Sequence, residues 1–259
     1  MMTGKRIFFS LMLLAAAGVA ADEHRIDSAV YAWDALEVER QGARERRSVF
    51  KGSTAGFEYF EVHASTVPPG AAAHAAHTHD DREELIIVRE GAVEQTINGA
   101  SRVLSPGSVV LLLPGDLHGI RNAGDDPATY YVIRWRTRGF DGSARQDAGS
   151  LSADWDDLEF RETSKGGRRS IMRVPTAMLA EFEIHTTLLN PGMKSHDPHT
   201  HVEDEIILVR YGQVEEMIDG VPYEAGPGDV IFLEANGSHG IRNSGEGPCE
   251  YYAFKWRLP

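Results

Sequence analysis

The segment HTHDDREELIIVR at residues 77–89 returns, one residue shorter, as HTHVEDEIILVR at residues 199–210. Each copy begins with two histidines one residue apart and continues through acidic residues into a short apolar run rich in β-branched side chains. Side chains two residues apart on a strand point to the same face, so both imidazoles of each pair are directed to one side. A strand presents two ligands to a single ion in this way, and the chain encodes the arrangement twice.

The whole chain is organised by this duplication. Residues before the repeated segment match their counterparts at an offset of 122, and residues from Glu84 and Glu205 onward match at an offset of 121. All four tryptophans and ten of the eleven histidines are paired across the halves in this way. Self-similarity at a constant offset indicates a duplicated structural unit, here of about 105 residues. We expect an N-terminal unit at residues 22–137, a linker at 138–152 and a C-terminal unit at 153–259.

Short apolar runs separated by turn signals fill each unit. In the first unit the runs at 84–89, 109–113 and 129–135 carry the β-branched and aromatic residues that are typical of strands. Asn98-Gly99 and its counterpart Asp219-Gly220 are strong hairpin signals, and 26 glycines and 12 prolines supply further turns. Short antiparallel strands in units of this size predict an all-β protein built from two small barrels or jelly rolls.

The charge balance excludes two classes of partner. Lysine and arginine number 26 against 39 aspartates and glutamates, which gives a formal net charge of -13. A chain of this charge repels phosphate backbones and anionic lipid headgroups. We therefore expect no nucleic acid partner and no binding to a membrane surface.

The N-terminal residues have the pattern of a secretory signal peptide. Lys5 and Arg6 precede an apolar run at residues 7–17, and the small residues at 18–21 fit a cleavage site. The run is shorter than the roughly 20 apolar residues that cross a bilayer. We expect residues 1–21 to be removed, leaving a periplasmic or secreted protein that begins near Asp22.

Each unit holds two further candidate ligands besides its histidine pair. The candidate metal ligands are His77, His79, Glu84 and His118 in the first unit and His199, His201, Glu205 and His239 in the second. Glu84 is preferred to its neighbour Glu83 because Glu84 precedes Gly91 by seven residues, as Glu205 precedes Gly212. Three neutral imidazoles and one carboxylate leave one or two positions open on a divalent first-row metal, which is typical of catalytic sites.

These residues resemble the paired motifs of the cupin superfamily. The first unit reads Gly70…His77-x-His79-x4-Glu84-x6-Gly91, then Gly107…Gly115-x2-His118-x3-Asn122, and the second unit follows the same scheme. The resemblance covers essentially the whole chain after the leader, so the chain is similar to a bicupin. It departs from the family pattern at Leu113 and Glu234, where the family has proline, and at Asn236, where it has glycine.

The resemblance implies both a fold and a cofactor. The fold is two tandem cupin-type double-stranded β-barrels, or jelly rolls. Each barrel holds one divalent transition metal at its centre through three histidines and one glutamate, and manganese or iron is favoured. Zinc, nickel, cobalt and copper also suit imidazole and carboxylate donors.

Four polar residues outside the ligand set are candidates for a direct role. Gln95 and its counterpart Glu216 fall on strand faces that are otherwise apolar, where a polar side chain is a candidate acid, base or substrate contact. We assign the catalytic role to Glu216. His63 and His185 either hydrogen-bond the metal ligands or the substrate, or belong to an outer polar face.

Dioxygenases, decarboxylases and oxidases are the commonest precedents that the resemblance implies. We therefore expect a metalloenzyme that acts on a small oxygenated organic substrate, such as an organic acid, an enediol or a phenol. Aminohydrolases, lyases and isomerases share the same ligand set, so a non-oxidative cupin enzyme is one alternative, and a non-enzymatic metal- or sugar-binding module is another. Two barrels in one chain already mimic a dimer, so the sequence leaves both a monomer and a homo-oligomer open.

Overall fold

The computed structural model describes residues 24–142 and 149–259, which form 20 strands and two short 3-10 turns. The predicted signal peptide, residues 1–21, lies outside the described residues. The 3-10 turns, Trp33–Ala35 and Trp155–Asp157, have three residues each. No helix in the described ranges is long and apolar enough to cross a membrane.

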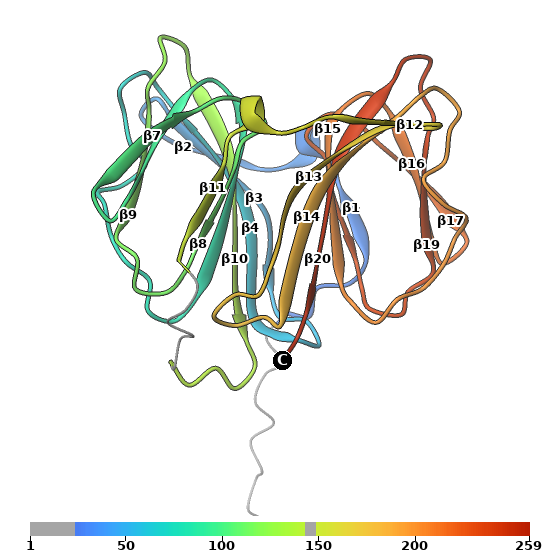
Figure 1. Ribbon diagram of the computed structural model, residues 1–259, viewed down its shortest axis with the longest axis horizontal. Helices are drawn as coiled ribbons and strands as arrows, with labels where there is room; N and C mark the ends of the chain where they lie inside the picture. The colour runs from blue at the N-terminus through green and yellow to red at the C-terminus, as the bar shows by residue number, and fades with distance from the viewer. Residues whose placement is uncertain (1–23, 143–148) are drawn as a thin grey trace, which may run out of the picture.

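The first unit packs a seven-stranded antiparallel sheet against a three-stranded one (Figure 1). Tight turns with left-handed residues, such as Asn98 at φ 48°, connect the shorter strands, as the hairpin signals predict. Its strands are β2 (Val38–Gln41), β3 (Arg44–Gly52), β4 (Phe57–Val67), β5 (Glu83–Glu90), β6 (Val93–Ile97), β7 (Ala100–Leu104), β8 (Val109–Leu112), β9 (His118–Asn122) and β10 (Ala128–Thr137).

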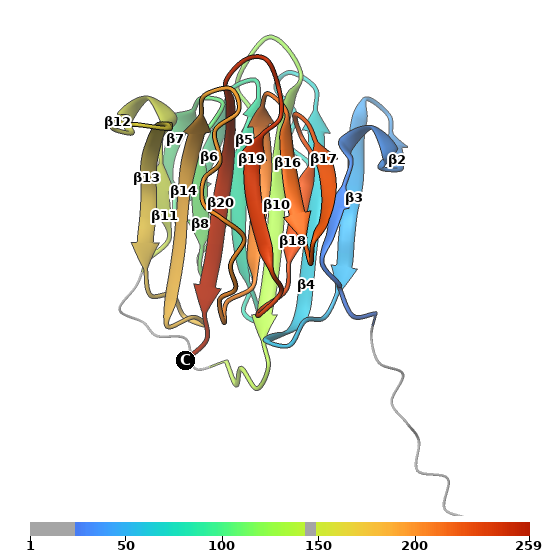
Figure 2. The ribbon, with the colours of Figure 1, turned by 90° about the vertical axis from the view of Figure 1, so that its right-hand side faces the viewer.

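The second unit repeats this arrangement strand for strand. Figure 2 shows β2 and β12, the corresponding edge strands of the two large sheets, on opposite sides of the molecule. The strands are β12 (Arg161–Thr163), β13 (Gly166–Val174), β14 (Glu181–Leu189), β15 (Glu205–Tyr211), β16 (Val214–Ile218), β17 (Val221–Ala225), β18 (Val230–Leu233), β19 (His239–Asn243) and β20 (Cys249–Arg257).

The two units exchange their first strands. Strand β1 (Ala29–Tyr31) lies at the N-terminal end of the first unit in sequence but pairs with β18 of the second unit, and β11 (Leu151–Ala153), at the start of the second unit, pairs with β8 of the first. Figure 1 shows each of these strands at the edge of the other unit's large sheet. The sheets therefore do not follow the unit boundaries expected from the repeat, because pairing of an edge strand depends on long-range contacts that a repeat offset does not encode.

The central strands of each large sheet are buried on both faces. One face of β10 turns Tyr130 and Val132 toward the interior of the first barrel, and the other turns Tyr131, Ile133 and Trp135 toward the second unit. The cluster between the units includes aromatic residues of both, and Phe57 stacks on Trp256 at a centroid distance of 5.0 Å. Such aromatic pairs contribute about 0.5–1.5 kcal/mol beyond their burial.

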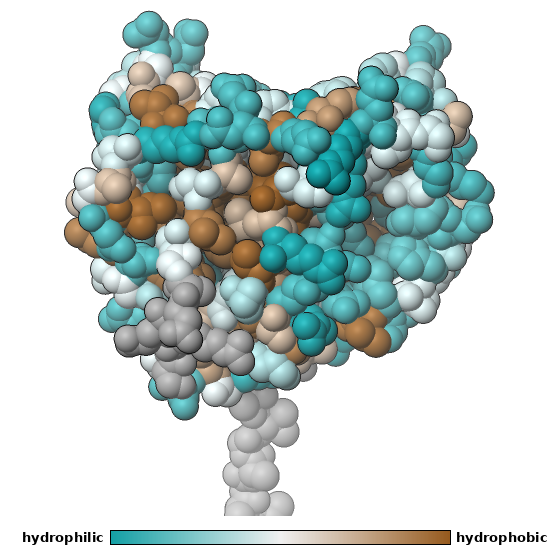
Figure 3. Space-filling model, viewed as in Figure 1, coloured by the Kyte–Doolittle hydropathy of each residue, from teal (hydrophilic) through white to brown (hydrophobic). Residues whose placement is uncertain are grey.

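The prediction of an all-β protein with two tandem barrels is confirmed by this topology. The units meet along their large sheets, and the three-stranded sheets lie on the outer sides (Figure 1). In the space-filling view most of the visible surface is polar, and apolar side chains gather near the middle of this face (Figure 3).

Candidate metal centres

In the first unit, three strand or loop segments bring the predicted histidines together. The backbones of His77 and His118 form a two-way bridge, with both N···O distances 2.9 Å, which places the start of β9 beside the histidine pair. His79 follows at the same side of this bridge, and one nitrogen from each of the three rings lies within 4.8 Å of the other two. The carboxylate of Glu84, on β5, lies 3.6 Å from His79 Nε2 and 3.9 Å from His118 Nε2.

The second unit repeats this geometry. His199 and His239 form the corresponding backbone bridge, with both N···O distances 3.0 Å, and His201 completes the triad within the same 4.8 Å limit. Glu205 Oε2 lies 2.9 Å from His201 Nε2 and 3.5 Å from His239 Nε2. The structure therefore brings together all eight residues that the sequence nominated as ligands, in two separate groups.

Backbone carbonyls orient most of these imidazoles. His118 Nδ1 contacts the carbonyl of Asp116 at 2.9 Å, and His239 Nδ1 contacts that of Gly237 at 3.0 Å. A carbonyl only accepts, so Nδ1 carries the proton and Nε2 presents its lone pair toward the group. The buried Nε2 atoms of His118 and His239 have no hydrogen-bond partner in the described part of the chain. A nitrogen lone pair buried without a donor fits a metal ligand.

The ionisation states of most of these donors also fit a cation; His201 is the exception, because its hydrogen bond with Glu205 raises its pKa. Burial and the neighbouring imidazoles lower the pKa of His77 to about 4, and burial lowers that of His118. Burial opposes ionisation of Glu84 and Glu205, but His79 and Arg134 at Glu84, and His201 and His239 at Glu205, outweigh it and lower both pKa values to about 2. Neutral imidazoles and an ionised carboxylate are the forms that bind a metal. Each group can therefore hold one divalent transition ion.

The carboxylates of the two groups have different neighbours. Arg134, on β10, places Nε 2.5 Å from Glu84 Oε2. At the corresponding position the second unit has Lys255, which pairs with Glu205 along the strand register. A planar guanidinium holds a carboxylate in a fixed orientation, whereas an ammonium acts as a point charge, so the two centres differ in how firmly the glutamate is held.

Gln95 and Glu216 both lie in barrel interiors. Gln95 is 2% exposed and donates from Nε2 to the carbonyl of Thr96, while its Oε1 has no partner among the described residues. Glu216 is 1% exposed, and neither carboxylate oxygen makes a hydrogen bond of normal geometry there, although the backbone of Gly240 is close. Burial and the charge of Glu205 raise the pKa of Glu216 to about 8.

His63 and His185 lie inside their barrels. The two side chains are 7% and 19% exposed, and each Nδ1 lies near a glutamate two residues earlier, at 3.7 Å from Glu61 and 3.5 Å from Glu183. Burial lowers the pKa of both histidines to about 4. The structure thus favours the inward alternative over the outer polar face, because the opposite face of β4 packs against the other unit.

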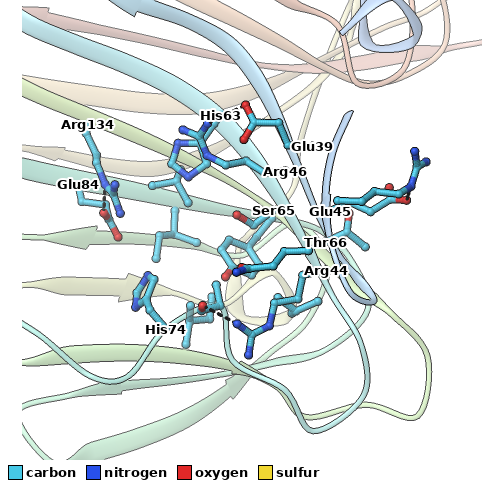
Figure 4. Close-up of a pocket in the computed structure, with 18 residues that line it drawn as sticks. Glu39, Arg44, Glu45, Arg46, His63, Ser65, Thr66, His74, Glu84 and Arg134 are labelled. Atoms are coloured by element: carbon cyan, nitrogen blue, oxygen red, sulfur yellow. Dashed lines mark hydrogen bonds and ion pairs between the residues drawn. The ribbon is translucent and has the colours of Figure 1, made fainter. Parts of the chain in front are cut away.

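The sequence reasoning missed Arg134, which contacts Glu84 from a neighbouring strand, and the polar residues of the adjoining cavity. This cavity, of about 410 Å³, extends to Glu84, and Arg44, Arg134 and Tyr130 are part of its lining (Figure 4). These residues come from β3 and β10, and nothing in their local sequence indicates that they converge. In the second unit Lys165 makes the backbone contact that corresponds to that of Arg44.

Two antiparallel β-barrels in one chain, each with three histidines and a glutamate gathered at its centre, define the bicupin class of protein. The cupin domain model matches residues 64–134 and 185–255, one match in each unit, so the chain belongs to the cupin domain family.

Solved structures share this architecture at low sequence identity. Protein Ylba from E. coli is 17% identical with a TM-score of 0.69, covering 89% of this chain and 90% of its own. AerE from Microcystis aeruginosa is 15% identical with a TM-score of 0.66, covering 85% and 96%. A formate complex of oxalate decarboxylase from Lactobacillus farciminis is 13% identical with a TM-score of 0.67, covering 92% and 88%. At these identities the likeness concerns the fold.

A curated relative matches over a short segment. The transcriptional activator RhaS from Mannheimia succiniciproducens is 33% identical to this chain over 45 residues. The match covers 17% of this chain and 17% of that protein.

Proposed function

We propose that this bicupin is an exported metalloenzyme that acts on a small oxygenated organic substrate at an open coordination position. Oxidase, dioxygenase or decarboxylase chemistry is the favoured class, with manganese or iron as the metal. The bound metal would supply a Lewis acid or a platform for dioxygen chemistry. The oxalate decarboxylases that share the fold support this class, and the signal-like residues 1–21 support export.

The observation that carries the proposal is the donor set of each barrel. Three imidazoles and one carboxylate converge within a few ångströms, and in the first unit a cavity of about 410 Å³ reaches the carboxylate. A structural site closes its coordination shell with protein atoms, whereas this set leaves space beside the ligands. A small molecule can therefore approach the centre from the cavity.

Protein groups around the centres have distinct proposed tasks. Arg134 fixes the orientation of Glu84, and His63 lies in the wall of the same cavity, where it can contact a substrate. Glu216 is the proposed acid–base residue of the second unit, because its inward carboxylate is not engaged by another side chain of the described residues. Gln95 cannot exchange a proton, so we assign acid–base catalysis to the second unit.

Metal analysis of the chain from Asp22, purified without chelator or affinity tag, tests the premise. We expect about one manganese or iron ion per unit, and we expect His77→Ala and His199→Ala each to lose the metal of one unit. Zinc or nickel would favour a hydrolase or isomerase instead. A folded protein that contains no metal in either unit would contradict the proposal.

The role of Glu216 is tested by a pair of adjacent substitutions. Glu216→Gln copies the residue of the first unit, and Glu215→Gln changes a carboxylate on the outer face, where it pairs with Arg242. With oxalate, ascorbate and catechol as probes, we expect Glu216→Gln to lower kcat at least 100-fold at unchanged metal content. Glu215→Gln should keep the kcat of the wild type. Equal turnover in both variants would exclude Glu216 from catalysis.

A further inference from the structure

The cavity of the first unit joins the metal centre to the β2–β3 hairpin. Its inner end includes Glu84 and Arg134, and its outer end includes Arg44 and Arg46 of β3. Apolar side chains, among them Ile86 and Val132, form part of the wall between the two ends. Figure 4 shows the Arg134–Glu84 pair at one end of this space and Arg44 at the other.

The lining is cationic although the chain as a whole is acidic. It contains four arginines and three glutamates, in a protein of formal net charge -13. Glu84 pairs with Arg134, and Glu45 at the mouth pairs with Arg40 and Arg47.

The remaining charged side chains of the lining also have ion-pair partners, with one exception. Glu39 approaches Arg46 at 4.0 Å, and Arg46 is further held by Glu61 at 2.6 Å. Arg44 is half-buried and donates to the carbonyl of Ala73 at 3.0 Å, but it makes no ion pair within residues 24–142 and 149–259. A half-buried guanidinium with unsatisfied donors favours an anion from outside the chain.

Two buried polar groups in the same wall lack partners. The Tyr130 hydroxyl is close to Ser65 but makes no hydrogen bond of normal geometry, and His63 Nδ1 has no hydrogen-bond partner in the described part of the chain. Both residues are more than nine-tenths buried, at 1% and 6% exposure. Buried polar atoms are normally satisfied, so their presence along one cavity indicates a polar occupant.

The second unit places an ammonium where the first places a guanidinium. Lys165 donates from Nζ to the carbonyl of Ser195, the counterpart of Ala73, as Arg44 does in the first unit. Lys255 likewise replaces Arg134 beside the glutamate. A guanidinium matches both oxygens of a carboxylate, whereas an ammonium is a point charge, so the first barrel is the better carboxylate site.

We infer that the first unit selects a small organic anion with two oxygen-bearing ends, one a carboxylate held by Arg44 and the other directed to the His77, His79 and His118 centre. The inference rests on the proposed function for the metal end and names the substrate class of that site. Tyr130 and His63 provide hydrogen bonds along the length of the anion. The second unit, with ammonium groups at these places, binds it more weakly.

Calorimetric titration of the full metal-loaded chain tests this inference, with malonate, succinate and glutarate as probes and the corresponding diamides as neutral analogues. We expect at least one dicarboxylate to bind to a tighter site with a stoichiometry of one per chain, and the diamides to bind there at least tenfold more weakly. Arg44→Gly removes the guanidinium and should weaken binding of the dicarboxylate at that site at least tenfold. Arg121→Gln, which removes an arginine that pairs with Glu94 on the outer face, should leave the affinity unchanged.

Three results would overturn the inference: no dicarboxylate binds, Arg44→Gly binds as well as the wild type, or two anions bind per chain with equal affinity. Thermal unfolding and metal content, measured on the same samples, confirm that each variant is folded and loaded. A chain that binds no metal contradicts the proposed function. A metal-loaded chain that binds the dicarboxylates and the neutral diamides with equal affinity contradicts the role of Arg44. The two failures are therefore distinguishable.

Discussion

Cys249 illustrates how burial determines the chemistry of a single residue. It is the one cysteine of the sequence, it is 0% exposed, and it takes the position of Ala128 in the first unit. A Cβ atom on Gly212 would lie 2.6 Å from Cys249, so the two positions are packed together and the glycine is required. The thiol is a small packing group here.

We predict that Cys249 is inert toward thiol reagents in the folded protein. Burial raises the pKa of its thiol to about 11, so at pH 8 only about a thousandth of it is the reactive thiolate, even before access is considered. Labelling with a chromogenic disulfide at pH 8 should give no signal from the native chain and one thiol per chain after addition of guanidinium. Stoichiometric labelling of the native protein within minutes would show that the residue is accessible.

Side-chain chemistry also distinguishes the two barrels. At paired positions the units carry Gln95 or Glu216. At another pair of contacts, Arg44 donates to the carbonyl of Ala73 and Lys165 to that of Ser195. These differences, within a duplication that keeps all eight donors, underlie the different tasks that we propose for the two units.

At the scale of elements, the last residue of β9 and of β19 ties three segments together. Asn122 donates from Nδ2 to the carbonyls of Val67 and Asp126 and accepts from the backbone of Gly124. Asn243 makes the same three bonds, to Leu189, Gly247 and Gly245. The bonds fix the end of the strand that begins with the third histidine of each centre.

We predict that Asn243→Ala lowers the free energy of unfolding by about 2–4 kcal/mol, because three bonds are lost and buried backbone groups stay unpaired. The neighbouring Ser244→Ala, which removes an exposed bond to Glu224, should cost less than about 0.5 kcal/mol. Urea unfolding followed by tryptophan fluorescence gives both values. Equal costs for the two variants would mean that the asparagine bonds add no stability.

The whole molecule is held together across the interface by a buried carboxylate. Glu83 is 0% exposed and accepts hydrogen bonds from Trp135 Nε1 at 2.8 Å, from Thr176 Oγ1 at 2.8 Å and from the backbone of Met178 at 3.0 Å. Two of these donors belong to the second unit. Glu83 therefore links the units, while the adjacent Glu84 belongs to the metal centre.

We predict that Glu83→Ala destabilises the chain by about 3 kcal/mol or more, because three buried donors lose their acceptor. Glu90→Ala removes an exposed carboxylate from the far end of the same strand, where it pairs with Arg89, and should change stability by less than about 0.5 kcal/mol. Differential scanning calorimetry compares the two. An unfolding temperature of Glu83→Ala equal to that of the wild type would show that the interface does not depend on this residue.

Strand exchange makes each unit dependent on the other. The sheet of the second unit takes β1 from the N-terminal side of the chain, and the sheet of the first takes β11. The interface also contains two reciprocal bonds, from the Tyr131 hydroxyl to the carbonyl of Gly228 and from the Tyr252 hydroxyl to that of Gly107.

We predict that the polypeptides 24–142 and 149–259 aggregate or stay partly unfolded when produced separately and form a folded 1:1 complex when produced together. Each alone exposes the apolar sheet face that the other covers and lacks the edge strand that the other supplies. Size-exclusion chromatography with light scattering distinguishes the outcomes. Two folded, monomeric halves would show that the exchange is not needed for folding.

The sequence by itself determined the duplication, the all-β architecture and the eight residues that form the two centres. These features are local: turn signals, strand periodicity and the spacing of histidines on one face each depend on neighbouring residues. The repeat strengthened them, because two copies in register identified Glu84 rather than Glu83 as the residue that faces the histidines.

Only the tertiary structure decided which strand completes which sheet and what surrounds each centre. Both faces of β4 and β10 are buried, one in a barrel and one between the units, so alternation of side chains could not tell which face holds His63. Arg134 reaches the first centre, and Arg44 reaches the cavity beside it, through strand pairings between residues far apart in sequence. Such register depends on packing of the whole sheet, and no local pattern in the sequence encodes it.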